Sequence, residues 1–267
     1  MPNACFVHFI LKYCGLALVV LMIDFHGVMA QEPSTIEARL KNAQQLKSAG
    51  KYSQAQEIYQ ALLKDPGVPK KQMKGIRKKL EKLNTELLFS RFAMPGSVFY
   101  TVVEGDSLRE IAKKNNTTIE LIKKANGLKG DKILPGMKLK VMNGTFSIKV
   151  DKSDNVLTLL LNDQVFKHYP VATGEKNSTP TGEFKIVSKV ENPTWYHDGA
   201  VVAPENPENI LGTRWLGFDY QGYGIHGTTK PESVGKQVSA GCVRMINEDA
   251  EELYAIVPNG TKVFVKD

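Results

Sequence analysis

Residues 34–92 place their hydrophobic side chains at three- and four-residue intervals, the spacing of one face of an α-helix. The positions that share this spacing are Ala38, Ala43, Leu46, Ala55, Ile58, Tyr59, Leu62 and Leu63. A turn at residues 48–52 separates two such runs, and the two prolines in residues 66–69 end the second run. The pattern therefore predicts a helical hairpin followed by a third helix over residues 70–90.

Residues 98–143 show a different and more compact pattern. An alternating run at 99–103 predicts a strand, and helices are expected over 108–114 and 118–125, with Asp106 or Ser107 capping the first of them. Asn126 and Gly127 end the second helix, and a last strand is expected at 138–142. The segment is thus predicted to be a small strand–helix–helix–strand module.

Residues 145–267 consist mainly of short strand-like runs separated by Gly and Pro. Strands are expected at 146–150, 156–161, 165–172, 183–187 and 262–265. One helix is expected at 247–255, with Asn247 as its N-cap and acidic residues in its first turn. The whole chain is therefore predicted to be a multidomain α+β protein that ends in a mostly-β domain.

The first 30 residues have the layout of a secretory signal peptide. Lys12 precedes an apolar run at 16–23, and small residues at Val28 and Ala30 suit a cleavage site. The run is short for a membrane span. We expect an exported protein of the periplasm or cell wall, and the alternative of an uncleaved segment would provide its only attachment to a membrane.

Charge divides the chain. Residues 33–92 hold 13 Lys/Arg against 5 Asp/Glu, a net of +8, whereas residues 145–267 hold 12 against 16, a net of −4. A basic N-terminal half suits either a solvated helix face or contact with an anionic polymer or membrane surface, and an exported chain is not expected to meet nucleic acid. No metal-ligand cluster or phosphate-binding glycine loop is evident, so we expect neither metal nor cofactor.

Cys242 is the only cysteine outside the predicted signal peptide, and His226 lies sixteen residues before it. A free thiol has a pKa of about 8.5, so it needs a base to act as a nucleophile near neutral pH, and an imidazole can supply one. Gly241 before the cysteine lets the backbone approach a substrate carbonyl, where nearby amides can bind an oxyanion. A buried, unreactive thiol is the alternative.

The sequence around this pair resembles the YkuD, or L,D-transpeptidase, family. The segments IHGT at 225–228 and SAGCVRM at 239–245 carry the resemblance, together with TPTGEF at 179–184 and LGTRWLG at 211–217. It implies Cys242 as nucleophile, His226 as base and the carbonyl of Gly227 as a partner of the imidazole. Ser239 and Gly241 occupy supporting positions. Ala240 departs from the family, which often has histidine there, so any oxyanion role at that position falls to the backbone amide.

Three side chains are candidates for holding substrate. Arg214 and Arg244 have the guanidinium geometry that binds a carboxylate, and pairing within the fold is the alternative for both. Trp195 lies in a stretch, 192–222, that is expected to form a loop over the site.

The module at 98–143 closely resembles a LysM domain. The residues that carry this match are Tyr100, Val102, Gly105, Asp106, Ser107, Leu108, Ile111, Ala112, Asn126, Pro135, Gly136 and Leu139. The resemblance implies binding to the glycan chains of peptidoglycan.

The hairpin at 34–92 resembles a single tetratricopeptide unit, which suggests a spacer or a docking surface for a protein partner.

Together these resemblances imply a cell-wall enzyme that forms a thioester with peptidoglycan stem peptides and transfers it to an amine or to water. Two other interpretations stay open: a non-catalytic peptidoglycan-binding protein, favoured by Ala240, and a cysteine endopeptidase. The order of the residues, with His226 before Cys242, is unlike that of the papain-like endopeptidases.

Overall fold

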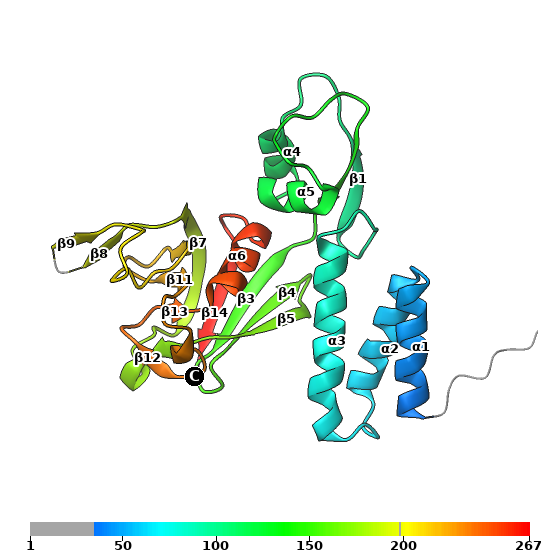
Figure 1. Ribbon diagram of the computed structural model, residues 1–267, viewed down its shortest axis with the longest axis horizontal. Helices are drawn as coiled ribbons and strands as arrows, with labels where there is room; N and C mark the ends of the chain where they lie inside the picture. The colour runs from blue at the N-terminus through cyan, green and yellow to red at the C-terminus, as the bar shows by residue number, and fades with distance from the viewer. Residues whose placement is uncertain (1–34, 198) are drawn as a thin grey trace, which may run out of the picture.

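The computed structural model describes residues 35–197 and 199–267. The predicted signal peptide at 1–30 lies outside the described residues. The described chain forms three regions, a helical segment, a small LysM-like module and a sheet domain, in the order predicted from the sequence (Figure 1). Among the described residues, no helix combines the length and apolar character needed to span a membrane.

The helical segment contains α1 (Ile36–Ser48), α2 (Tyr52–Lys64) and α3 (Lys70–Leu88). Thr35 caps α1 through its side chain, and Gly50 adopts a positive φ of 74° in the turn between the first two helices. The hairpin does not stand alone, because α3 packs against strand β5 of the sheet domain.

The LysM-like module pairs β1 (Ser97–Thr101) with β2 (Lys138–Met142) and packs α4 (Leu108–Lys114) and α5 (Ile119–Asn126) beside them. Ser107, rather than Asp106, is the N-cap of α4, where it forms a capping box with Glu110. The buried amide of Asn126 bonds both the N–H and the carbonyl of Lys140. The polar residues of the motif therefore fix the start of α4 and hold α5 to β2.

The remaining residues form an eight-stranded sheet with the order β13-β11-β10-β7-β14-β3-β4-β5. Its strands are β3 (Phe146–Asp151), β4 (Val156–Leu161), β5 (Gln164–Pro170), β7 (Gly182–Glu191), β10 (Arg214–Phe218), β11 (Gly224–His226), β13 (Val243–Arg244) and β14 (Lys262–Lys266). Neighbours are antiparallel except for the pairs β14–β3 and β11–β13. Helix α6 (Asn247–Ile256) packs on β10 and β11.

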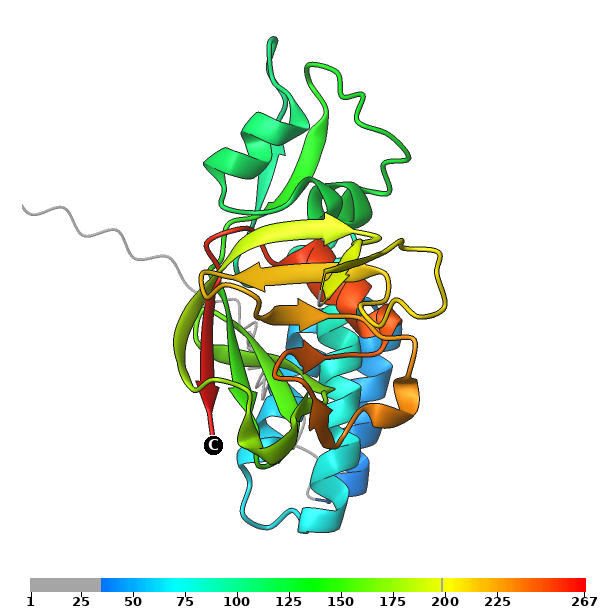
Figure 2. The same ribbon diagram turned by 90° about the vertical axis from the view of Figure 1, so that its left-hand side faces the viewer.

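Two small pairs of strands lie outside this sheet. Strand β6 (Thr173–Gly174) is parallel to β12 (Gln237–Ser239), and β8 (Trp195–His197) forms a hairpin with β9 (Ala200–Val202). Two short 3₁₀ turns, Glu175–Asn177 and Pro231–Ser233, complete the described elements. Figure 2 shows the sheet in front of α3, with the LysM-like module above both.

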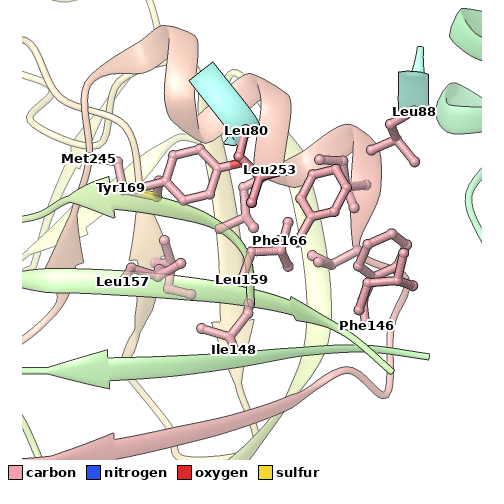
Figure 3. Packing of buried hydrophobic residues seen from close by; sticks show 14 of the residues in the cluster. Leu80, Leu88, Phe146, Ile148, Leu157, Leu159, Phe166, Tyr169, Met245 and Leu253 are labelled. Atoms are coloured by element: carbon pink, nitrogen blue, oxygen red, sulfur yellow. The ribbon is translucent and has the colours of Figure 1, made fainter. Parts of the chain in front are cut away.

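One continuous hydrophobic core joins the helical segment to the sheet domain. Leu80 of α3 and Phe166 of β5 belong to the same buried cluster as Leu253 of α6 (Figure 3). Edge strand β5 would expose unpaired backbone groups, but Asn84 donates to the Phe166 carbonyl at 2.9 Å. Helix α3 therefore covers the sheet edge, which is one way in which proteins prevent edge-to-edge association.

The LysM-like module is held at two joints. Lys140 is 1% exposed, and its ammonium donates to the carbonyls of Leu87 at 2.5 Å and Ser90 at 2.9 Å, at the C-terminal end of α3. On the other side, the Thr118 hydroxyl donates to the carbonyl of Ala255 in α6. A cation at a helix C-terminus interacts favourably with the helix dipole, so the first joint is also favourable electrostatically.

Candidate functional site

A parallel pair of short strands brings the two candidate catalytic residues to one edge of the sheet. Strand β11 ends at His226, and β13 begins one residue after Cys242. The register pairs Ile225 with Val243 and His226 with Arg244. Residues sixteen positions apart in the chain are thereby placed on neighbouring strands, with Cys242 at the mouth of the pair.

His226 is buried, and its orientation is fixed by the backbone. The side chain is 2% exposed, and Nδ1 lies 2.6 Å from the carbonyl oxygen of Gly227. This bond places the proton on Nδ1 and leaves Nε2 as the basic nitrogen. Gly227 has no space for a larger residue, because a Cβ there would lie 2.2 Å from Oδ1 of Asn247.

Burial also sets the charge of the imidazole. It lowers the pKa of His226 to about 4, the Gly227 carbonyl opposes this shift, and the Arg244 charge adds to it. His226 is therefore neutral at neutral pH, which is the protonation state that a general base needs.

Cys242 is half-buried and ends a tight turn. The Ser239 hydroxyl donates to the Cys242 carbonyl at 2.6 Å and accepts from the Gly241 amide at 3.2 Å. Gly241 has a φ of 136°, and a Cβ there would lie 2.8 Å from the ring of Tyr223. The turn thus requires glycine immediately before the cysteine, and the Ser239 hydroxyl holds both that glycine and the cysteine after it.

The thiol is protonated at neutral pH. Burial raises the pKa of Cys242, whereas the Gly224 amide and the Arg244 charge lower it. Its Sγ donates to the carbonyl of Gly222 at 3.5 Å, and no hydrogen bond joins it to His226 among the described residues. At rest, therefore, the Cys242 thiol and the His226 imidazole are both neutral.

Cys242 opens into a cavity of about 510 Å³. The wall of this cavity is largely apolar, and its lining includes Trp195, Leu211, Trp215 and Gly222. His226 is not one of the lining residues, but its ring stacks on that of Trp215, which is, with centroids 6.0 Å apart. A cavity of this size can hold a small peptide segment against the thiol.

The three candidate substrate-binding residues have different positions. Trp195 lines the cavity, at the start of the β8–β9 hairpin, and stacks on His197 at 4.8 Å. Arg244 is buried and donates to the Ser233 hydroxyl at 3.2 Å, while its Nε has no partner. Its charge reaches both Cys242 and His226, since it lowers the pKa of each.

Arg214 lies away from the cavity lining. Its guanidinium donates to the Thr213 carbonyl at 2.7 Å, lies 3.7 Å from the Glu191 carboxylate and stacks over Tyr254. These contacts are those of a residue paired within the fold, which was the alternative interpretation of the sequence.

Asn247 has a different role from the predicted one. Ile246 is the N-cap of α6, and Asn247 is the first residue of the helix. Its Oδ1 accepts from the amides of Thr213 at 3.2 Å and Thr228 at 3.0 Å. Asn247 therefore fixes the backbone just after His226. In the sequence, an Asn at the start of a helix looks like an N-cap, because Asn is a preferred N-cap residue and its side-chain oxygen can equally accept from backbone amides elsewhere.

Two lining residues of the cavity were not singled out as site residues in the sequence. Leu211 and Gly222 both fall in the stretch 192–222 that was expected to lie over the site, but their positions in the cavity wall depend on the fold. Within the described residues, no group of three or more His, Cys, Asp or Glu side chains is arranged to hold a metal ion.

Comparisons with known proteins identify two domains in the chain. Residues 145–265 match the L,D-transpeptidase catalytic domain known as YkuD, and residues 100–141 match the LysM domain. The chain is 38% identical over 174 residues to "Putative L,D-transpeptidase YkuD" of Bacillus subtilis (strain 168), an alignment that covers 62% of this chain and 97% of that protein. It is 41% identical over 144 residues to "Putative L,D-transpeptidase YqjB" of the same organism, covering 52% of this chain and 76% of that protein.

The solved catalytic domain of the E. faecium L,D-transpeptidase, determined by NMR, is 25% identical to this chain with a TM-score of 0.39. That alignment covers 45% of this chain and 96% of the solved domain. The match over nearly the whole length of a 38% identical relative settles the family: the chain belongs to the L,D-transpeptidases, with a YkuD catalytic domain preceded by a LysM domain.

Proposed function

We propose that this protein is a cell-wall L,D-transpeptidase in which Cys242 is acylated by a peptidoglycan stem peptide. One observation carries the proposal: the Cys242 thiol opens into a cavity at the end of the strand pair that also holds His226. A neutral base beside a nucleophile that faces a substrate-sized cavity is the arrangement that covalent acyl transfer requires. LysM and YkuD domains both imply peptidoglycan as the partner.

The first step is attack by sulfur on the peptide carbonyl of the third stem residue. The thiol turns from the Gly222 carbonyl toward Nε2 of His226, which takes its proton as the S–C bond forms. Because His226 has a low pKa and Cys242 a raised one, proton transfer accompanies attack instead of producing a stable ion pair beforehand.

Backbone amides stabilise the tetrahedral oxyanion. The Gly241 amide already donates to Ser239, so we assign the oxyanion to the amides of Ala240 and Cys242. Alanine at position 240 keeps this amide, so the departure from the family pattern leaves the backbone contribution in place.

Collapse of the intermediate breaks the C–N bond, and the imidazolium of His226 returns its proton to the departing amine of D-alanine. An amine of a second stem peptide then attacks the thioester and restores the free thiol, giving a 3→3 cross-link. Water as acceptor would make the product a shortened stem peptide. The LysM domain, which is joined to the rest of the chain by hydrogen bonds of Lys140 and Thr118, would bind the glycan chain that carries the donor stem.

Export to the periplasm or cell wall belongs to the same proposal. It is supported by the layout of residues 1–30 and by the wall polymer that both domains imply.

Intact mass of the protein after incubation with a disaccharide-tetrapeptide tests the activity. We expect a mass gain equal to the donor less D-alanine, absent from Cys242→Ala at equal thermal stability. Cys242→Ser is the matched control for shape, because it keeps the size of the side chain and removes the thiol. An unmodified wild-type protein that is folded and still binds glycan would favour a non-catalytic wall-binding protein.

A further inference from the structure

Helix α3 carries seven cationic side chains on its N-terminal two-thirds. They are Lys70, Lys71, Lys74, Arg77, Lys78, Lys79 and Lys82, and all are exposed. None of the seven makes an ion pair or hydrogen bond with the described part of the chain. The two carboxylates of the same helix are used elsewhere: Glu81 contacts His168 at 2.5 Å, and Glu86 pairs with Lys47 at 2.6 Å.

These cations form a stripe on the side of the helix that faces solvent. Lys71, Lys74, Lys78 and Lys82 recur at three- and four-residue intervals and so share one face. Ile76, Leu80, Leu83 and Leu87 occupy the opposite face and are buried. The cationic stripe is therefore directed away from the core along its whole length.

The placement of these charges opposes the stability of the helix. The first turn contains Lys70 and Lys71 with no acidic residue, and the last turn contains no basic residue. The helix dipole favours the reverse arrangement, and like charges four residues apart, such as Lys74 and Lys78, repel each other. The stability of the helix therefore does not explain why these lysines are present. Binding of an anionic ligand would explain them.

From this stripe we infer that the exposed face of α3 is a docking surface for a linear, phosphate-bearing polymer of the cell wall. Residues 70–82 of a helix extend for about 18 Å at roughly 1.5 Å per residue. A repeating polyanion can lie along that length and meet several lysines at once. It would thereby release bound counterions, which is the main source of affinity in such contacts.

A lipid bilayer fits this surface less well. Helices that lie on membranes bury an apolar face among the acyl chains. Here the apolar face of α3 is already packed on α2 and β5, and none of the three described helices α1–α3 has a large exposed hydrophobic residue. The exposed face of α3 therefore provides positive charge but no apolar side chain that could insert into a bilayer.

The surface is separate from the catalytic site. Helix α3 covers β5, at one end of the strand order, whereas His226 and Cys242 lie at β11 and β13, at the other end. A polymer bound to α3 leaves the cavity accessible. Anchoring by α3 and glycan binding by the LysM domain would hold the enzyme on the wall by two independent contacts.

The test compares the full chain with two charge-matched triple variants. The first is Lys74→Gln/Lys78→Gln/Lys82→Gln. The control is Lys149→Gln/Lys185→Gln/Lys262→Gln, which removes three exposed lysines from strands of the sheet. Binding to poly(glycerol phosphate) is measured by calorimetry over a range of salt concentrations, with vesicles of phosphatidylglycerol and phosphatidylcholine as a second probe.

We expect the α3 variant to lose about tenfold or more in affinity for the polymer near physiological salt. The slope of log K against log salt should become shallower by about 2, at roughly 0.7 for each lost phosphate contact. The control should bind within about twofold of wild type, and all three proteins should acylate at the same rate. If both variants lost affinity for the polymer equally, the loss would be due to net charge and not to the α3 surface, and the inference would be overturned. Tight binding to vesicles with none to the polymer would also overturn it.

Discussion

His226 and Lys140 are both buried basic side chains, and they lie in regions that use burial differently. His226 is 2% exposed in the catalytic site, and Lys140 is 1% exposed where the LysM domain meets α3. Burial lowers the pKa of both, to about 4 for His226 and to about 8 for Lys140. The direction is the same because burial disfavours the charged form of any base.

The partners of the two groups make the difference. The ammonium of Lys140 donates to carbonyls of Leu87, Leu88 and Ser90, all at the end of α3. The imidazole of His226 bonds the Gly227 carbonyl, and the Leu211 backbone is a second polar neighbour that opposes the fall in its pKa. A buried ammonium that bonds several carbonyls acts as a structural joint, whereas a buried imidazole that is neutral at neutral pH is suited to act as a base.

The largest expected effect follows from removing the base. In His226→Gln, acylation of Cys242 should slow by about 10²- to 10⁴-fold, the range that general-base catalysis contributes. Rates of mass gain with the tetrapeptide donor measure this. Lys140→Met is the comparison, and its acylation rate should stay within about twofold of wild type because it contacts no part of the cavity. A normal rate in His226→Gln would remove His226 from the mechanism.

Acid should destabilise the catalytic domain through the same histidine. The folded-state pKa of about 4 lies below the unfolded value of 6.5, so between these pH values the unfolded chain binds the proton and the folded one does not. Stability from this group is therefore present above pH 6.5 and lost as pH falls toward 4, by up to about 3 kcal/mol.

Denaturant unfolding at pH 7 and pH 4.5 checks this for wild type and for His226→Gln. Carboxylates such as Asp151 also change charge in acid, but they do so in both proteins, so the difference between the two isolates the histidine. The same loss in both proteins would contradict the assignment.

A smaller effect, on the free energy of unfolding, is expected where Lys140 of the LysM domain contacts the end of α3. Lys140→Met removes the donor from buried carbonyls at the end of α3 and should lower the free energy of unfolding by about 2 kcal/mol. Lys138→Met on the same strand is the matched control, because Lys138 is exposed and should change stability by less than about 0.5 kcal/mol. Equal changes in the two variants would show that the ammonium does not hold the joint.

The sequence predicted regular elements well where the pattern is local. The two LysM strands, both LysM helices and strands β3, β4 and β14 lie within a few residues of their expected positions. The prediction was weaker between residues 192 and 244, where β10 and β11 contain glycines and β11 and β13 have only three and two residues. Strands of two or three residues have too few positions to show a period, so their pairing appears only in the fold.

The candidate site divides in a similar way. The sequence singled out Cys242, His226, Gly227, Ser239, Gly241 and Arg244 from the residues that flank the pair, and the structure places all of them around one strand pair. Their catalytic roles stay predictions. Arg214 looked equivalent to Arg244 in the sequence, since only three-dimensional contacts distinguish a guanidinium paired with Glu191 from one whose charge reaches the thiol.

The sequence by itself indicated the types of domain, their order and the candidate nucleophile, because turns, hydrophobic periods and flanking motifs are properties of neighbouring residues. Tertiary structure alone decided the parallel pairing of β11, which ends at His226, with β13, which follows Cys242, the burial that keeps both side chains neutral, and the packing of α3 on β5. Each of these depends on contacts between residues far apart in the chain. Desolvation, which sets both pKa values, exists only after those contacts have excluded water.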